Sequence, residues 1–176
     1  ALEKYIVSKD DSIYEAWPDI AMTKNGKLIC VFSECKHHGD RDQARIVYKE
    51  SLDKGKTWSE KIALTEKGTS KNYFNCARIS RMPDESLIII ADYVVENENH
   101  MARTYLWRSY DDGITWQGPF DNPSAGIVPD KIKVLKSGRW IISSHFLDRS
   151  INKLVQYLWY SDDEGKTWSD KITVAR

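Results

Sequence analysis

Histidine and carboxylate side chains, a frequent combination for general acid–base catalysis, lie close together in the polar segment ECKHHGDRDQ at residues 34–43. In this segment a carboxyl group can protonate a leaving group while a neighbouring imidazole assists the transfer. Asp40, Asp42, His37 and His38 are therefore the candidate catalytic residues.

Two further polar segments, at 92–102 and 145–153, carry the remaining histidines of the chain. These segments, and the residues that lead into three short apolar runs, contain the side-chain types that bind sugars, because carboxylates and guanidinium groups bond hydroxyls and aromatic rings contact sugar faces. The candidate ligand-binding residues are Trp17, Asp19, Glu34, Arg78, Asp92, Tyr93, His100, Asp130, His145 and Arg149. Surface loops are polar in most proteins, so the same composition is also expected without a ligand.

No metal site and no cofactor are expected. His37 and His38 are adjacent, so their side chains diverge on a strand. Cys30, Cys35 and Cys76 are odd in number and lack C-x-x-C spacing, which predicts free thiols rather than a zinc site or a disulfide framework.

The overall charge excludes two classes of partner. The chain has 26 basic and 26 acidic side chains, and this balance creates no field that would attract nucleic acid or an anionic membrane surface. No apolar run reaches the roughly 18–20 residues of a membrane helix. The first residues lack a signal-peptide layout, and the odd cysteine count fits a reducing compartment, which favours a cytoplasmic protein. A mature secreted form that has lost its leader is the alternative.

The elements that position these residues are indicated by an internal repeat. The pattern S-x-D-x-G-x-T-W occurs three times. Its fixed positions are Ser51, Asp53, Gly55, Thr57 and Trp58; Ser109, Asp111, Gly113, Thr115 and Trp116; and Ser161, Asp163, Gly165, Thr167 and Trp168. Each position has a physical role in a tight hairpin: glycine supplies a positive φ, serine and aspartate bond nearby backbone groups, and tryptophan buries apolar surface.

The sequence around each hairpin repeats as well. Two apolar runs precede every hairpin, one follows it, and a short strand with a polar turn lies further upstream. No stretch shows sustained helical periodicity, so the chain is predicted to be all-β. We expect an outer strand at 1–10 and three four-stranded units at 11–66, 67–123 and 124–176.

The hairpin pattern resembles the Asp-box, or bacterial neuraminidase repeat, of the sialidase superfamily. This resemblance implies a sialidase-like β-propeller in which each unit is one blade and the Asp-boxes lie away from the active site. The loops between second and third strands would then share the opposite face with the segments leading into first strands. Sialidase-like propellers have six blades, so three blades are half a ring, and we expect a homodimer to close it. The alternative is a fragment of a longer gene product.

The resemblance carries over less well to catalysis. Sialidases place an arginine before Ile-Pro at the first strand of blade 1, and the matching segment here is Ala16-Trp17-Pro18. The family's acid/base aspartate comes from the region of Asp40 or Asp42, whereas its nucleophilic tyrosine and glutamate come from later blades. We therefore expect a carbohydrate-active glycoside hydrolase relative, with an activity that is undefined or lost, rather than a true sialidase. The alternatives are a non-catalytic glycan- or protein-binding propeller and a purely structural half-propeller.

Overall fold

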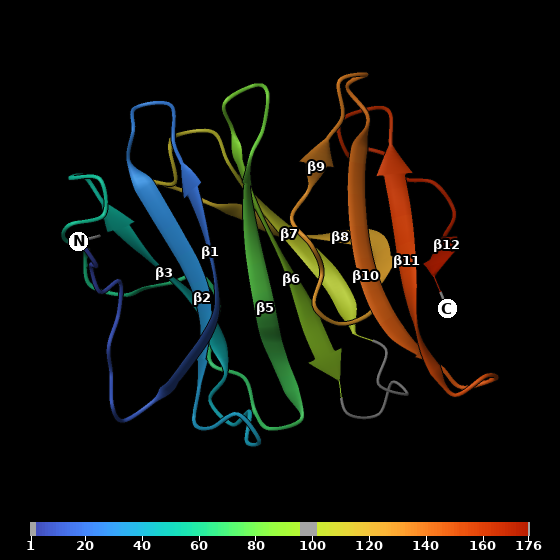
Figure 1. Ribbon diagram of the computed structural model, residues 1–176, viewed down its shortest axis with the longest axis horizontal. Helices are drawn as coiled ribbons and strands as arrows, with labels where there is room; N and C mark the ends of the chain where they lie inside the picture. The colour runs from blue at the N-terminus through green and yellow to red at the C-terminus, as the bar shows by residue number, and fades with distance from the viewer. Residues whose placement is uncertain (1–2, 96–101, 176) are drawn as a thin grey trace.

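The computed structural model describes residues 3–95 and 102–175, and these form three four-stranded antiparallel sheets arranged side by side (Figure 1). Each sheet follows chain order, and the described residues contain no helix. The first sheet holds β1 (Tyr14–Met22), β2 (Leu28–Cys35), β3 (Arg45–Ser51) and β4 (Ile62–Ala63); the second β5 (Asn72–Arg81), β6 (Leu87–Val95), β7 (Arg103–Ser109) and β8 (Gln117–Ala125); the third β9 (Lys133–Val134), β10 (Trp140–Asp148), β11 (Lys153–Ser161) and β12 (Ile172–Ala175). The expected all-β fold of three four-stranded blades is confirmed.

The ends of the units differ in two places from the expected divisions. The strand β8 continues to Ala125, past the division expected at residue 123. Residues 3–10, expected to form an outer strand, are not part of any strand. In each blade the fourth strand pairs with the third strand of the same blade, and among the described residues this segment has no strand beside it to pair with. Instead Val7 packs against Cys30 and Phe32 on the outward side of the first sheet.

The core lies between the sheets because alternate residues of a strand point to opposite faces. On β6, Leu87, Ile89 and Ala91 pack toward the first sheet. The intervening Ile88 and Ile90 pack toward the third sheet with Trp140 and Ile142. The central blade is therefore apolar on both faces, which explains the uninterrupted run SLIII in the sequence.

Each S-x-D-x-G-x-T-W hairpin is held by the same internal hydrogen bonds. In the first, the Ser51 hydroxyl accepts the Gly55 N–H at 2.8 Å and donates to the Asp53 carboxylate at 2.9 Å. That carboxylate also accepts the Thr57 N–H at 2.9 Å and the Thr57 hydroxyl at 2.7 Å. Hydrogen bonds from threonine lower the pKa of Asp53 to about 2. The pKa values of Asp111 and Asp163 are lowered to about 2 in the same way. These three hairpins are self-sufficient turns.

The glycine of each hairpin cannot be replaced without strain. Gly55, Gly113 and Gly165 have φ of 86°, 83° and 84°. At Gly113 an added Cβ would also lie 2.4 Å from the Ile29 side chain of the neighbouring sheet. The second hairpin therefore takes part in the contact between blades 1 and 2.

The start of each blade, within β1 and β5 and ahead of β9, has the same irregular backbone conformation, which the sequence did not reveal. Trp17, Cys76 and Val128 occupy equivalent positions and have φ of 54°, 48° and 53°. The register of β1 with β2 and of β5 with β6 shifts at these residues. The bulge of blade 2 is fixed from blade 1, since the Cys76 N–H donates to the buried Ser33 hydroxyl at 3.0 Å.

We predict that Ser51→Ala lowers the free energy of unfolding by about 1–3 kcal/mol, because the buried Gly55 N–H loses its acceptor. Urea unfolding followed by tryptophan fluorescence measures the change. Leu52→Ala is the matched control, since this neighbouring side chain is 85% exposed and its loss should cost no more than about 0.5 kcal/mol. Equal effects from the two substitutions would contradict the assigned role of the serine.

Candidate functional site

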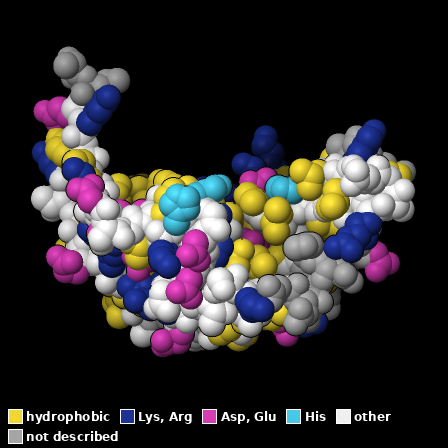
Figure 2. Space-filling model, turned by 90° about the horizontal axis from the view of Figure 1, so that it is seen from below, with side chains coloured by type: hydrophobic (Ala, Val, Ile, Leu, Met, Phe, Trp, Pro, Cys, Tyr) yellow, Lys and Arg dark blue, Asp and Glu magenta, His cyan; other side chains and the backbone are white. Residues whose placement is uncertain are grey.

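The loops that join second to third strands lie at the lower end of the sheets in Figure 1, and the hairpins lie toward the opposite end. We call the lower end the loop face. Seen from this side, histidine side chains lie in two places, with basic, acidic and apolar side chains between and around them (Figure 2). Antiparallel pairing imposes this separation. The loop from the second strand enters the third strand at one end, and the hairpin leaves it at the other end.

Four side chains of blade 1 form a contact group on the loop face, here called the rim cluster: Tyr14, Trp17, His38 and Arg41. The Tyr14 hydroxyl is 3.0 Å from Nδ1 of His38, and the centroids of these two rings are 5.5 Å apart. The Trp17 ring lies 5.9 Å from each of them. The Arg41 guanidinium lies over the indole at 4.4 Å, a cation–π contact that fixes both groups.

The left-handed conformation at Trp17 connects the rim cluster to blade 2. It directs the Trp17 carbonyl toward Arg78, whose guanidinium donates to it at 3.3 Å and to the Ala77 carbonyl at 2.9 Å. Arg41 also reaches blade 2, where its charge partly offsets the burial that raises the pKa of Tyr73. The site is therefore built at the seam between two blades.

Asp92, a carboxyl group that is completely buried, lies on the face of β6 that carries Ile88 and Ile90 and packs toward blade 3. Neither of its oxygens has a well-aligned hydrogen-bond donor among the described residues, although the backbone N–H groups of Asp92 and Val128 are close enough to favour its charged form. Burial raises the pKa of Asp92 to about 7, opposed in part by the charges of Arg78 and Arg41. A carboxyl group that titrates near neutral pH at such a seam is characteristic of functional sites.

No protein-family model matches the sequence. A sialidase from Clostridium perfringens is 25% identical over 207 residues, which cover 93% of this chain and 51% of the sialidase. The chain thus spans about half the length of the curated relative that it matches.

Solved structures extend the likeness. A protein of unknown function from Dyadobacter fermentans gives a TM-score of 0.74 at 21% identity, covering 94% of this chain and 56% of that one. A Hadza microbial sialidase gives a TM-score of 0.70 at 20% identity, and the match covers 88% of this chain and 36% of that one. An α-L-arabinofuranosidase of Fusarium graminearum gives a TM-score of 0.66 at 14% identity, and the match covers 96% of this chain and 52% of that one. This chain has a sialidase-like β-propeller fold. Its three blades correspond to part of the propeller of the longer proteins.

Within this sialidase-like propeller, the candidate catalytic residues share one short loop. Asp40 accepts the Asp42 N–H at 3.0 Å and pairs with Lys36 at 3.3 Å, and these contacts lower its pKa. His37 uses Nδ1 to accept the Gly39 N–H at 3.1 Å. Of the four candidates, only His38 contacts Trp17. An aspartate held in its ionised form is poorly suited to act as a general acid.

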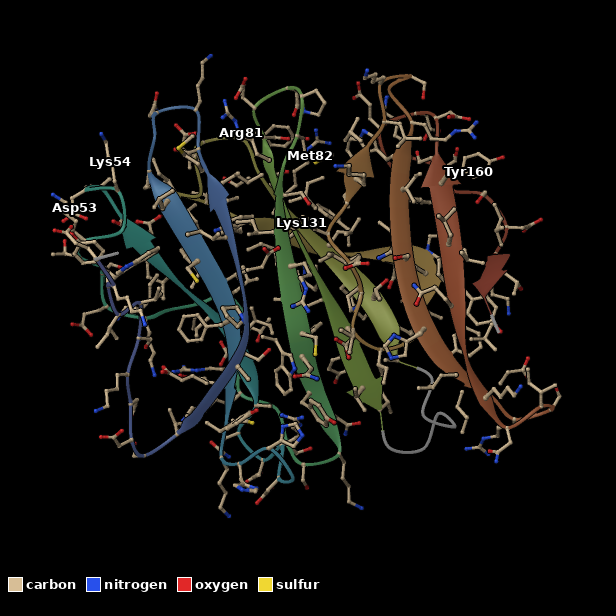
Figure 3. The ribbon with its side chains drawn as sticks, in the orientation of Figure 1. Asp53, Lys54, Arg81, Met82, Lys131 and Tyr160 are labelled. Atoms are coloured by element: carbon tan, nitrogen blue, oxygen red, sulfur yellow. The ribbon has the colours of Figure 1, made fainter. Side chains whose placement is uncertain are left out.

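Three ligand-binding candidates have structural partners instead. Glu34 faces the outward side of blade 1 and is paired with Arg45 at 2.6 Å and Lys61 at 2.9 Å, which lower its pKa against the effect of burial. Asp19 connects all three blades, because it accepts the Ile79 N–H at 3.0 Å and the Lys131 ammonium at 2.8 Å. Lys131 is labelled near the centre of Figure 3. Tyr93 packs against Phe74, with ring centroids 4.6 Å apart.

The remaining candidates belong to blade 3 or lie outside the described residues. Asp130 accepts the Ser143 hydroxyl at 3.2 Å. The backbone of His145 pairs with Ile127. Arg149 lines a groove between blades 2 and 3. His100 falls in the segment 96–101, which the structure does not describe. The structure thus joins Trp17, His38 and Arg78 at the seam between blades 1 and 2. It places Asp92 on the blade 3 side of β6, within reach of the charges of Arg78 and Arg41, and distributes the others.

Sequence reasoning did not select Tyr14 or Arg41 as site residues. Tyr14 could have been found by aligning the segments that precede Trp17 and Cys76, since it then occupies the position equivalent to Tyr73 of blade 2. Arg41 stood among several charged loop residues, and nothing in the sequence indicated that it stacks on Trp17. The described residues contain no group of three metal-binding side chains and no helix able to span a membrane.

We predict that Asp92→Asn removes a pH-dependent destabilisation of the fold. Because the folded-state pKa is raised to about 7, folding favours the protonated acid, and stability is lost as pH rises from about 4 through 7. The free energy of unfolding of the variant, relative to the unsubstituted protein, should therefore rise over this range, by up to about 4 kcal/mol.

Urea titrations at several pH values test this expectation. Asp11→Asn is the control, because the Asp11 side chain is exposed and its substitution should leave the pH profile unchanged. A constant difference between Asp92→Asn and the unsubstituted protein across pH 4–8 would show that Asp92 is ionised throughout.

Proposed function

We propose that this chain forms part of the sugar-binding site of a glycoside hydrolase, with the rim cluster and Arg78 contacting the glycan. The observation that carries the proposal is the Arg41–Trp17 stack at 4.4 Å, on the face where histidines and loop carboxylates also lie. An indole, a phenol and two guanidinium groups present both an apolar face and several hydrogen-bond donors. Sugar rings need this combination, because they have apolar C–H faces and polar edges.

Each residue has a distinct role in this proposal. Trp17 and Tyr14 contact the ring face, Arg41 donates to hydroxyl or carboxylate oxygens, and His38 is held in place by Tyr14. Asp92 is fully buried, so it acts as a positioning residue that biases the two guanidinium groups through its charge. Asp42 is the better candidate for general acid, because Asp40 is held ionised by Lys36 and the Asp42 N–H.

Glycosidic bond cleavage normally uses two carboxyl groups on opposite sides of the bond. The rim cluster lies beside one loop that can supply such a group, and the relatives are about twice as long as this chain. In this proposal, the second group comes from the part of the ring that faces this seam from the other side. Sialidases and an arabinofuranosidase share the fold, so the proposal does not fix the sugar beyond a glycan with hydroxyl or carboxylate substituents.

We predict that Trp17→Ala weakens binding of neutral glycans, and any glycosidase activity, about five- to tenfold, because an aromatic contact contributes on the order of 1–1.5 kcal/mol. Asp42→Asn should abolish hydrolysis while leaving binding within about threefold, since the amide cannot donate the proton. A glycan array and a panel of chromogenic glycosides give the two readouts. The control is Ile114→Ala, an exposed side chain in a hairpin away from the loop face. Unchanged binding by Trp17→Ala would refute the proposed site.

We also propose that a second copy of the chain closes the ring. On β10, Ile141, Ser143, His145 and Leu147 occupy the positions that on β6 face the next blade. Leu147 is exposed there, and its partner Leu154 on β11 is 61% exposed. A sheet face that continues the inter-blade pattern and exposes two leucines fits another blade of the same repeat.

Light scattering tests this arrangement. The expected mass is about twice 20.4 kDa, and Leu154→Arg should reduce it to that of one chain by placing a charge in the interface. The control is Leu52→Arg, at an exposed hairpin position outside the proposed interface. A stable particle of 20.4 kDa for the unsubstituted protein would contradict closure by a second copy.

A further inference from the structure

The two seams between neighbouring blades are filled differently. Between blades 1 and 2, the Phe74 ring lies 4.6 Å from Tyr93 and 5.7 Å from Tyr105, and these two tyrosines are 6.0 Å apart at 85°. In blade 3 the positions of the two tyrosines are occupied by Phe146 and Tyr157, as the strand registers show. The lower part of the first seam is thus closed by a third aromatic ring.

The third ring is missing from the seam between blades 2 and 3. The residue that precedes the Val128 bulge by two, as Phe74 precedes Cys76, is Gly126. Gly126 has φ of 117°, and an added Cβ would lie 2.6 Å from the His145 carbonyl oxygen. No side chain can be placed here without moving the backbone, so the space that Phe74 fills in one seam stays open in the other.

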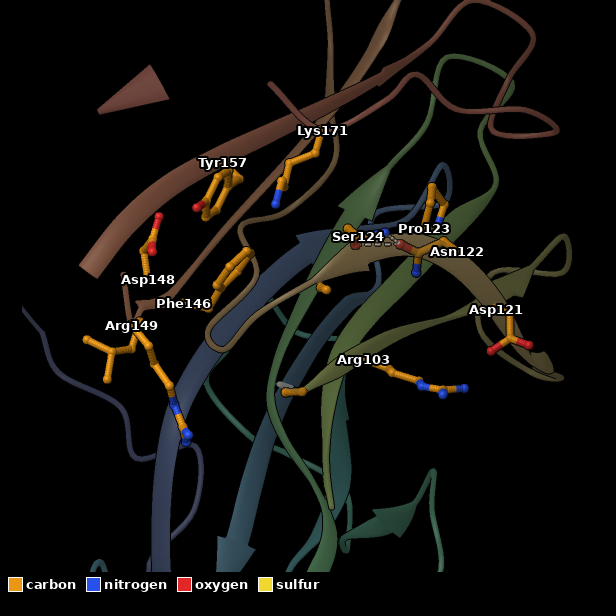
Figure 4. A pocket seen from close by; sticks show the side chains of 13 residues that line it. Arg103, Asp121, Asn122, Pro123, Ser124, Phe146, Asp148, Arg149, Tyr157 and Lys171 are labelled. Carbon is orange, nitrogen blue, oxygen red and sulfur yellow. Dashed lines mark hydrogen bonds between the residues drawn. The ribbon is translucent and has the colours of Figure 1, made fainter. Parts of the chain in front are cut away.

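A groove of about 840 Å³ occupies this seam (Figure 4). One wall carries Phe146, Tyr157 and Lys171, and the opposite wall is β8 with Asp121 and Pro123. The volume is within the 300–1,000 Å³ typical of small-molecule sites. The groove opens between β8 and the third sheet, on a different seam from the rim cluster.

The walls of the groove combine aromatic, cationic and rigid polar groups. Phe146 and Tyr157 are stacked at 4.2 Å and 18°, and the Lys171 ammonium is 5.0 and 4.6 Å from their centroids. Phe146 remains partly exposed, as does the ammonium-bearing Lys171. On the β8 side, Asn122 donates to the Thr104 carbonyl at 2.9 Å and accepts the Ser124 N–H at 3.0 Å, so this wall is held in place before any ligand arrives.

We propose that this groove is a second carbohydrate site, separate from the rim cluster, which binds a sugar ring bearing a carboxylate. The ring occupies the space that Phe74 fills in the other seam and contacts the Phe146 face. The carboxylate pairs with Lys171, and Arg149, which also lines the groove, adds a second positive charge. The site holds one arm of a branched or extended acidic glycan outside the central ring, and it does not depend on the proposed function of the rim cluster.

Saturation-transfer NMR tests the proposal with three probes: N-acetylneuraminic acid, glucuronic acid and galactose. We expect transfer to one or both acidic sugars, at least fivefold less to galactose, and loss of the signal in Phe146→Ala. Lys171→Gln should reduce the signal of the acidic sugars at least fivefold without changing that of galactose. Asp121→Trp, which fills the groove from its exposed wall, should block all binding even if Phe146→Ala proves unstable.

Two controls separate this groove from the rim cluster. Trp17→Ala should leave transfer to the acidic sugars within twofold, whereas loss of the signal in this variant would place the binding at the rim cluster and overturn the proposal. Lys133→Gln, an exposed lysine on β9 outside the groove, should have no effect. Absence of transfer to every probe, or transfer unaffected by Asp121→Trp, would also overturn it.

Discussion

The bulge at the start of each blade is the constraint on which the rest of the structure depends. A non-glycine residue with positive φ costs on the order of 1–3 kcal/mol, so it persists only where its surroundings require it. At Cys76 the requirement is a hydrogen bond across the seam to Ser33, and at Trp17 the same geometry directs a carbonyl to Arg78. These bonds join one blade to the next and at the same time position the side chains of the loop face. The connection between blades 1 and 2 and the geometry of the candidate site therefore depend on the same hydrogen bonds.

Specialisation arises where the repeats differ at equivalent positions. The position that holds the Ser33 hydroxyl in blade 1 holds the Asp92 carboxyl in blade 2 and an imidazole, that of His145, in blade 3. The hydroxyl is neutral and satisfied, whereas the carboxyl is buried near two guanidinium groups and has a raised pKa. In the same way, exchanging Phe74 for Gly126 converts a filled seam into a groove. The shared repeat maintains the fold, and these local exchanges create the chemical differences between seams.

The fold could be predicted from the sequence to a large extent, because its determinants are local. Ser51, Asp53, Gly55 and Thr57 bond only to one another and to their own backbone, so a short pattern was enough to place each hairpin and the strands around it. The site was predicted in part. Trp17, His38, Arg78 and Asp92 were selected for their residue type and loop position, but their contacts cross between strands and blades. The stack of Arg41 on Trp17 and the approach of the Val128 N–H to Asp92 both involve residues with a positive φ, which no residue type there encodes. The partners of Glu34 and Tyr93 could not be predicted for a related reason, since the side of the strand on which each lies decides whether it meets solvent or a neighbouring element.

Asp19 and Lys131 show why further blades would change the site as well as enlarge it. Their ion pair crosses from blade 1 to blade 3 at 2.8 Å, and Lys131 remains 48% exposed. A screened pair of this kind contributes little, but charges interact more strongly when water is displaced from around them. Blades added opposite this pair would withdraw it from solvent, and they would surround the Asp92 seam with more low-dielectric material. The raised pKa of Asp92 and the orientation of Arg41 and Arg78 would then be reinforced by the ring as a whole. Three blades thus contain the contacts of the proposed site, and a closed ring would add the low-dielectric surroundings that strengthen them.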